Sequence, residues 1–483
     1  MPRRQLNQKI AVSVVYVAAL FMSIMDITIV NVALPTLGRD LRVQQASVES
    51  VAIAYLVSLA VFIPASGWLG DRFGGRKVLL TAVVLFTGAS ALCGLAQSLS
   101  QLVVFRAVQG IGGGMMAPVG MAMLFRTFPP AERVRAASII LIPTTFAPAL
   151  GPVLGGLLVT DLSWRWVVFV NLPIGVIALA FGLVFLADHL PGEAGSFDLP
   201  GFLLAGAGLG LLMYGVSEAP VKGWSVPQIP VTIAVGAGLL ALFVAHELRR
   251  GDPMIDFRLL GDHLFRSATG SMIMAATAFL GGLYLVALFY QDGLGLSALQ
   301  SGLSTFPEAL GVMSGAQLAS RFFYPSFGPR RLMSAGLAVV AAALASVGLV
   351  GSHTSLWVPR GLMLVLGLGM AQVFVPAQAA AFATISSAST GRASALYNAG
   401  RQLGGAIGVA VLTTVATTVG SIHHPSSGPV SLRPFHVAFL AAALIALAGM
   451  AIATTVRDED AAATIVARHR RARDAEMEPA VPA

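Results

Sequence analysis

Cysteine and charged residues are both scarce in this sequence. Its 483 residues include a single cysteine, Cys93, and only 11% of them are charged. One cysteine excludes an internal disulfide and a cysteine-based metal cage. A soluble domain carries about 25% charged residues, so this chain has too few to cover a water-facing surface. The sequence also lacks a nucleophile–base set and metal-ligand spacing among its histidines. We therefore predict neither an enzyme, nor a metal site, nor a cofactor.

Apolar residues and glycine are abundant instead. The chain is 56% hydrophobic, contains 52 glycines and has a mean hydropathy of +0.81. Since a bilayer is crossed by about 20 apolar residues in a helix, this composition predicts an all-α integral membrane protein. The sequence contains fourteen such runs, near residues 11–34, 48–69, 78–97, 101–124, 134–159, 166–187, 199–217, 229–247, 267–290, 297–320, 331–350, 357–381, 393–418 and 435–456.

The basic residues indicate how these runs are oriented. With the N-terminus inside, the cytoplasmic segments hold 22 Lys and Arg and the outer loops hold six. The excess predicts a multi-pass protein of the inner (plasma) membrane with both termini in the cytoplasm. Because the net charge of +8 is spread over short loops, it does not indicate nucleic-acid binding. The first run contains no small-x-small cleavage site for a signal peptidase. We therefore interpret it as a retained span rather than a signal peptide.

A weak internal repeat divides the chain. Gly67–Lys77 follows the second run, and Leu318–Arg331 follows the tenth with a related glycine, Gly328, and related bases. Repeats eight spans apart predict two pseudo-symmetric six-helix bundles, 1–190 and 263–456, with two inserted helices in 191–262. Such halves are common in secondary transporters. The charged, Ala-rich segment 457–483 is predicted to be a disordered cytoplasmic tail.

Asp26 is the only acid in the first apolar run, and Arg106 opens the fourth. A charge in lipid is costly, so each must face protein or water, which makes both candidates for a functional site. By helical rise, Asp26 lies about 12 Å and Arg106 about 8 Å from the outer ends of their spans, so a pairing is possible. Gln109 shares the helical face of Arg106. We predict a proton-coupling role for Asp26 and Arg106, with a purely structural pairing as the alternative.

The loop Gly67–Lys77 combines glycines with charges in a short connection between two spans. Glycines permit a tight turn, and Asp71 can pair with a base or cap a helix. We predict that Gly67, Asp71, Arg72, Gly75 and Arg76 form a gating loop at the cytoplasmic side. The alternative is an ordinary positively charged inner loop.

In the fifth run, Ala147, Gly151 and Gly155 recur every four residues. This spacing is typical of a small-residue face on which helices pack closely. Pro148 and Pro152 remove backbone donors and permit a kink. Generic helix packing is the alternative.

Glu308 in the tenth run and Arg401 in the thirteenth both come near the middle of the membrane. We predict that Glu308 takes part in proton coupling or attracts cationic substrates, and that it pairs with Arg401 when the cavity is empty. A structural buried acid is the alternative. Gln109, Tyr55 and Tyr284 are further candidates for the cavity wall, although packing against lipid or protein would also account for the tyrosines.

Taken together, these residues resemble the major facilitator superfamily, in particular its fourteen-span drug:proton antiporter branch. The resemblance covers nearly the whole chain. Met25–Pro35 is similar to the family's first-span motif, Gly67–Lys77 to its loop motif and Leu102–Gly114 to its fourth-span arginine motif. Ala147–Gly156, with Gly151, Pro152, Gly155 and Gly156, resembles the motif of exporters, and Trp164–Gly175 also resembles this branch.

The resemblance implies alternating access around a central cavity, with proton influx driving efflux of bulky amphipathic or cationic drugs. Proton, small-molecule substrate and lipid bilayer are then the partners, and we expect a monomer. One alternative is a dedicated exporter of one metabolite or a self-made antibiotic. Another, from a different class, is a non-transporting membrane receptor or scaffold, but a scaffold has no need of Asp26, Arg106 and Glu308 inside the membrane.

Overall fold

The computed structural model describes residues 7–43, 45–187, 195–223, 226–420 and 431–465, and these form helices and short connections without a strand. In lipid every backbone amide and carbonyl must be bonded internally, and for apolar runs of this length the helix meets that requirement. Polar side chains set several starts. Ser98, Asp198 and Asp262 each accept a bond from a backbone amide three residues on, and Ser297 forms a capping box with Gln300.

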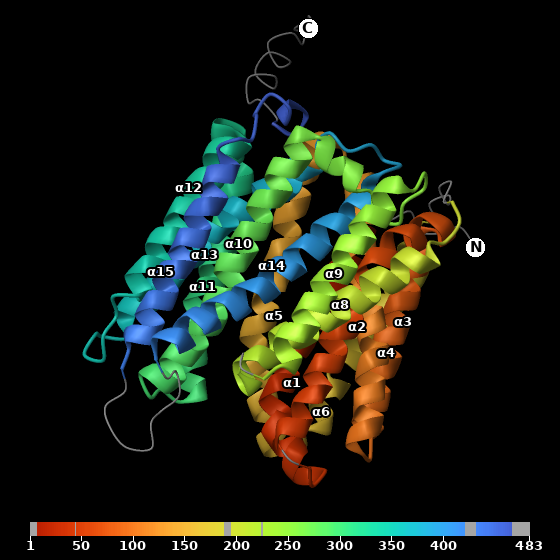
Figure 1. Ribbon diagram of the computed structural model, residues 1–483. Coiled ribbons are helices and arrows are strands. Elements are labelled where there is room, and N and C mark those ends of the chain that lie inside the picture. The colour runs from red at the N-terminus through yellow and green to blue at the C-terminus, as the bar shows by residue number, and fades with distance from the viewer. Residues whose placement is uncertain (1–6, 44, 188–194, 224–225, 421–430, 466–483) are drawn as a thin grey trace, which may run out of the picture.

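The helices fall into an N-terminal bundle, an inserted pair and a C-terminal bundle (Figure 1). The N-terminal bundle contains α1 (Gln8–Asp40), α2 (Gln45–Phe73), α3 (Gly75–Leu95), α4 (Leu99–Thr127), α5 (Arg133–Asp161), α6 (Arg165–Phe169) and α7 (Asn171–Phe185). The inserted pair is α8 (Leu199–Lys222) and α9 (Gln228–Arg249). The C-terminal bundle contains α10 (His263–Leu288), α11 (Ala298–Leu318), α12 (Tyr324–Val347), α13 (Trp357–Ala381), α14 (Thr390–Val419) and α15 (Arg433–Ala453).

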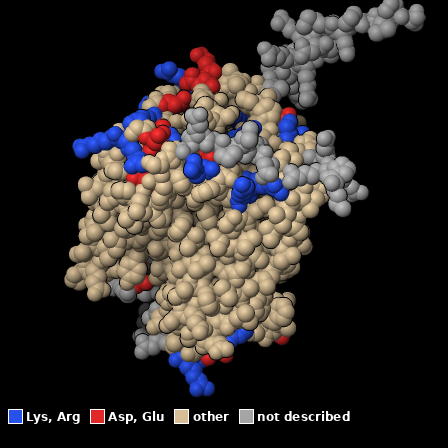
Figure 2. All heavy atoms as spheres, turned by 90° about the vertical axis from the view of Figure 1, so that its right-hand side faces the viewer, with Lys and Arg blue, Asp and Glu red and all other residues tan. Residues whose placement is uncertain are grey.

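Twelve segments of the described residues are long and apolar enough to cross a membrane. One of them, Gln300–Val347, contains both α11 and α12, while α5 supplies a shorter apolar stretch, Phe146–Asp161. Figure 2 shows on one face a broad uncharged band with charged side chains gathered above and below it. A multi-pass membrane protein accounts for this distribution, because charges are excluded from the hydrocarbon.

The predicted runs all fall on helices, with two differences in detail. The sixth run, expected to be continuous, is divided into α6 and α7 with Val170 between them. The helix α1 continues past the expected end of the first run to Asp40. Part of the segment expected to be a disordered tail is folded: the Tyr324 and Thr464 hydroxyls lie 2.6 Å apart. The remainder, 466–483, lies outside the described residues.

The two bundles meet through α2, α4 and α5 on one side and α11, α13 and α14 on the other. The inserted helix α8 packs against both α2 and α14 and so covers the seam between them (Figure 1). Ala60 of α2 and Leu209 and Met213 of α8 form a buried cluster there, against which Leu403 of α14 also packs. The interface between the bundles is where the candidate site lies.

Candidate functional site

Asp26 and Arg106 meet inside the N-terminal bundle and form an ion pair. Asp26 is 0% exposed and Arg106 is 1% exposed. The same carboxylate accepts hydrogen bonds from Gln109 Nε2 at 2.9 Å and from Asn171 Nδ2 at 2.8 Å, while Arg106 also donates to Gln109 Oε1 at 2.7 Å. Ser90 Oγ accepts from Gln109 and Asn171 and donates to a backbone carbonyl. Asp26 and Arg106, which helical rise places at similar depths, are therefore in direct contact.

Tyr55 covers the guanidinium of Arg106. The centre of its ring lies 4.4 Å from Arg106 Cζ, and its hydroxyl lies 2.9 Å from Ser23 Oγ. A desolvated cation over an aromatic face is stabilised by the ring quadrupole. Tyr55, and equally Gln109, therefore belong to the ion-pair network in this structure.

Sequence reasoning did not select Asn171 and Ser90 as site residues. Asn171 lies in the stretch Trp164–Gly175 that carried part of the family resemblance, so a signal for it existed. Its Oδ1 is buried without a hydrogen-bond partner. Ser90 has no distinguishing sequence context, and only the fold brings it to the network.

Glycines allow the helices around this network to approach closely. A Cβ on Gly110 would lie 2.5 Å from the Tyr55 carbonyl oxygen, so α4 packs directly on the backbone of α2. A Cβ on Gly151 would lie 2.0 Å from Thr28 Oγ1, and one on Gly155 would lie 3.1 Å from Ile29, both on α1. The predicted close-packing face of α5 therefore contacts α1. Gly156 faces open space, and the side chain of Pro152 is outside the described set.

The segment Gly67–Lys77, expected to be a loop, is helical apart from Gly74: Gly67 and Asp71 lie in the last turns of α2, and this end of α2 contacts the C-terminal bundle. Asp71 Oδ1 accepts a hydrogen bond from Arg126 Nη2 at 2.6 Å, and Arg126 also donates to the Ser387 carbonyl at 3.1 Å. A Cβ on Gly391, at the start of α14, would lie 2.9 Å from Asp71 Oδ1, and one on Gly67 would lie 2.9 Å from the Gly391 carbonyl. The end of α2 thus closes one end of the interface between the bundles.

Other predicted members of this loop lie away from that contact. Gly75 packs on Met123 of α4, while Arg76 donates to the Leu183 carbonyl at 2.8 Å within the N-terminal bundle. Arg72 is exposed. Gly74 has a φ of 88°, in the region that favours glycine, and this permits the turn from α2 into α3.

A second closure at the same end was not predicted from the sequence. Arg133, at the start of α5, donates to the carbonyl of Phe382, the residue that ends α13. The rings of Phe125 and Phe382 stack with centroids 4.6 Å apart. Ser394 of α14 donates to the Pro118 carbonyl of α4 at 2.7 Å. These contacts hold the two bundles together on the side where α14 begins.

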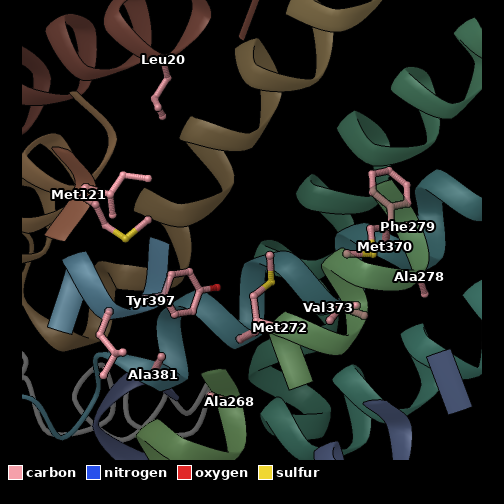
Figure 3. Close-up of a cluster of buried hydrophobic side chains, with 14 of the residues drawn as sticks. Leu20, Met121, Ala268, Met272, Ala278, Phe279, Met370, Val373, Ala381 and Tyr397 are labelled. Atoms are coloured by element: carbon pink, nitrogen blue, oxygen red, sulfur yellow. The ribbon is translucent and has the colours of Figure 1, made fainter. Parts of the chain in front are cut away.

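A cavity of about 330 Å³ lies between the bundles. Its wall is mostly apolar and is contributed by α1, α2, α4 and α5 from one bundle and by α10, α11, α13 and α14 from the other. Figure 3 draws five of its lining residues: Leu20 and Met121 come from the N-terminal bundle, and Met272, Phe279 and Tyr397 come from the C-terminal bundle. The residues of α1 that reach it are Tyr16, Leu20, Ser23, Ile24 and Ile27, one face of that helix.

Glu308 and Arg401 are the two charged residues among those that line this cavity. Glu308 is 9% exposed, and burial rather than a neighbouring charge dominates its environment. Within the described residues, Arg401 forms no ion pair with a carboxylate, so the expected Glu308–Arg401 pairing is not formed here. The phenols of Tyr16 and Tyr397 lie near Arg401.

Three other candidates for the cavity wall do not line it. Gln109 and Tyr55 lie in the Asp26 network, and Tyr284 is 41% exposed on the side of α10. Among the residues that the structure describes, no group of three His, Cys, Asp or Glu side chains is placed to hold a metal ion. The arrangement leaves room for an organic molecule between the two bundles.

Comparisons with known proteins agree with this arrangement. The sequence profile of the Major Facilitator Superfamily matches residues 16–409. The "Multidrug resistance protein B homolog" of Mycobacterium tuberculosis is 33% identical over 408 residues, which is 83% of this chain and 75% of that protein. The "Putative multidrug resistance protein MdtD" of Salmonella heidelberg is 35% identical over 340 residues, 68% of this chain and 71% of that protein.

Two solved structures share the fold. The human organic anion transporter MFSD10 superposes with a TM-score of 0.67 at 18% identity, covering 93% of this chain and all of that one. The proton:xylose symporter XylE superposes with a TM-score of 0.63 at 15% identity, covering 92% of this chain and 95% of that one. With a matching family profile over most of its length and multidrug-resistance relatives, this chain is a membrane transporter, not an enzyme, and it belongs to the Major Facilitator Superfamily.

Proposed function

We propose that this protein is a proton-coupled antiporter that exports bulky amphipathic compounds, cationic ones included, across the cytoplasmic membrane by alternating access. The observation that carries the proposal is the cavity between the bundles, with an apolar wall and one acid, Glu308. Apolar walls suit amphipathic molecules, and a few polar groups set their orientation. The names of the multidrug-resistance relatives point to the same class of substrate.

The proposed topology has fourteen spans, counting α11 and α12 separately, α6 with α7 as one, and α5 as a span. It places both termini in the cytoplasm, on the side where the sequence has its excess of bases. The contacts of Asp71 and Arg133 with the C-terminal bundle are then cytoplasmic. In this topology the contacts of Asp71 with Arg126 and of Arg133 with Phe382 support a conformation closed toward the cytoplasm.

We assign the exchangeable proton to Glu308 rather than to Asp26. Asp26 accepts hydrogen bonds from three donors, Arg106, Gln109 and Asn171, and it is not among the residues that line the cavity. Glu308 lines the cavity and forms no ion pair among the described residues. A carboxyl group in that position can bind either a proton or a cationic substrate. Competition between the two, alternately exposed to each side of the membrane, gives antiport.

The proposal is tested in proteoliposomes that contain the full chain and in which a pH gradient is the only driving force. The wild type should move an amphipathic cationic dye uphill against the flow of protons. Glu308→Gln should lose proton-driven movement but retain downhill exchange of the dye. Glu132→Gln is the matched control, because Glu132 is an acid far from the cavity that pairs with Lys9. Uphill transport by Glu308→Gln at the wild-type rate would contradict the assignment.

A further inference from the structure

Arg401 introduces a positive charge into the cavity. The proposed export of cations does not explain why a positive charge lies there. It lines the same cavity as Glu308, and among the described residues no carboxylate neutralises it. A partly buried guanidinium without a partner costs free energy unless an anion or dipoles compensate it. The cavity wall therefore presents one fixed positive charge that is available to a ligand.

Hydrogen-bond donors gather around Arg401. Tyr397 precedes it by one helical turn on α14 and so lies on the same face, and Tyr16 approaches from α1 on the opposite bundle. Both phenols are buried, at 2% and 1% exposed, and both line the cavity. Gln402 lines it as well. Phenol hydroxyls, an amide and a guanidinium can all donate to one carboxylate.

Apolar side chains line the cavity together with this donor group and the acid. Met272, Phe279 and Phe374 line the cavity, and the rings of Phe279 and Phe374 meet edge to face at 5.8 Å. The cavity thus combines an aromatic surface with one negative and one positive group that do not pair with each other. A ligand compensates the charges of both Glu308 and Arg401 when it carries one positive and one negative group itself.

We propose that the cavity binds amphipathic zwitterions, with the carboxylate of the ligand on Arg401, Tyr397 and Tyr16, its aromatic body on Phe279 and Phe374, and its cationic group toward Glu308. This inference rests on the proposed function and specifies its substrate class. Arg401 is then the residue that determines selectivity for ligands bearing a carboxylate. Bidentate recognition of a carboxylate also favours arginine over lysine at this position.

The test uses a matched pair of dyes: a rhodamine with a free carboxylate, and its methyl ester, which is a cation of nearly the same shape. Binding of each is measured by fluorescence anisotropy on the purified full chain, and transport is measured in proteoliposomes. The wild type should bind the free acid at least as tightly as the ester. Arg401→Gln should weaken binding of the acid roughly tenfold or more, as expected for a lost hydrogen-bonded charge, and leave the ester within about twofold.

Two further variants separate selectivity from misfolding. Arg401→Lys, which keeps the charge, should recover part of the affinity for the acid. Tyr397→Phe, which removes only a hydroxyl, should weaken binding of the free-acid dye by a smaller factor than Arg401→Gln does. Equal losses of both dyes in Arg401→Gln, with an unchanged melting temperature, would overturn the inference but leave the proposed function standing. If the wild type moves neither dye, the proposed function itself fails.

Discussion

The two bundles each contain one intramembrane acid and one intramembrane base, but they use them differently. In the N-terminal bundle, Asp26 and Arg106 are in contact and hydrogen-bonded to Gln109 and Asn171. In the C-terminal bundle, Glu308 and Arg401 both line the cavity without pairing. A satisfied buried pair makes a rigid element, whereas separated charges remain available to ligand and proton. We infer that the ion pair stabilises the N-terminal bundle, whereas Glu308 and Arg401 of the C-terminal bundle bind the proton and the ligand.

The largest effect is expected from breaking the pair in the N-terminal bundle. Arg106→Ala leaves Asp26 buried and uncompensated, and removing one partner of such a pair costs about 3–5 kcal/mol of folding stability. The variant should melt at a lower temperature in detergent and be poorly recovered from the membrane. The double variant Asp26→Asn with Arg106→Gln should recover part of that loss, because it leaves no unpaired charge. Wild-type melting of Arg106→Ala would contradict the assignment of a structural role.

A large effect on transport with little effect on stability is expected from the C-terminal bundle. Glu308→Gln removes a carboxyl group that has no ion-pair partner, so its melting temperature should stay near the wild-type value. Proton-driven transport should be lost for cationic and neutral dyes alike, because the proposed proton site is removed. Binding to the purified chain separates the second role: the affinity for a cationic dye should fall roughly tenfold or more, because a charge contact in a low-dielectric cavity is lost, and the affinity for a neutral dye of similar shape should fall less. Equal affinities of the variant and the wild type for the cationic dye would indicate that Glu308 acts on the proton path alone.

An intermediate effect is expected where Asp71 and Arg126 close one end of the interface between the bundles. Asp71→Ala removes the partner of Arg126 in a contact that is 13% and 21% exposed, where an ion pair contributes about 1 kcal/mol. This should shift the balance toward a state open at that end about fivefold. Thiol labelling of a cysteine introduced at Met121, in the cavity wall, measures the shift. The native Cys93 is 0% exposed and gives little background.

The control for this measurement is Arg72→Gln, which changes an exposed charge in the same loop. Labelling and transport in that variant should stay close to the wild type. If Asp71→Ala behaves in the same way as Arg72→Gln, the segment Gly67–Lys77 sets the orientation of the helices in the membrane and does not close the interface between the bundles.

The helices and the Asp26–Arg106 pair could be predicted from the sequence because both depend on position along a helix axis. Apolar length sets the spans, and helical rise sets the depth of each charge. Depth was not enough for Glu308 and Arg401. They come to a similar depth, but pairing also depends on which way each helix face turns, and that is fixed by packing across the whole bundle.

The closure by Arg133 could not be predicted for a different reason. Its partner is the backbone carbonyl of Phe382 at the end of α13. Every residue has a backbone carbonyl, so residue type does not indicate which carbonyl accepts the bond. In the same way, the Asp71–Arg126 contact joins two helices whose separation in the chain gives no sign of proximity. Such contacts follow from the fold, whereas the composition of the loops indicated only their side of the membrane.

The smallest effect is expected outside both bundles, at the base of the inserted helices. Asp198 is 1% exposed, caps α8 through the Gly201 amide at 3.0 Å, and contacts His246 at 3.1 Å and Arg250 at 3.3 Å. Asp198→Asn keeps the cap but loses the charge, so we expect a loss of about 1 kcal/mol and near-normal transport. Asp161→Asn, at an exposed acid, serves as the control.

The pH dependence of this loss distinguishes a charge effect from a packing effect. Burial alone would raise the pKa of Asp198, but the hydrogen bonds from Gly201, His246 and Glu247 and the nearby Arg250 outweigh it and lower the pKa below its usual range. Because folding favours the charged form, the stabilisation is fully present above the unfolded-chain pKa of about 3.9 and is lost as pH falls through the lower folded value. The difference in melting temperature between wild type and Asp198→Asn should therefore stay constant from pH 7 down to about pH 5 and shrink in more acidic buffer. A difference that persists unchanged at the lowest pH at which the protein stays folded would mean that the aspartate acts through its shape and not through its charge.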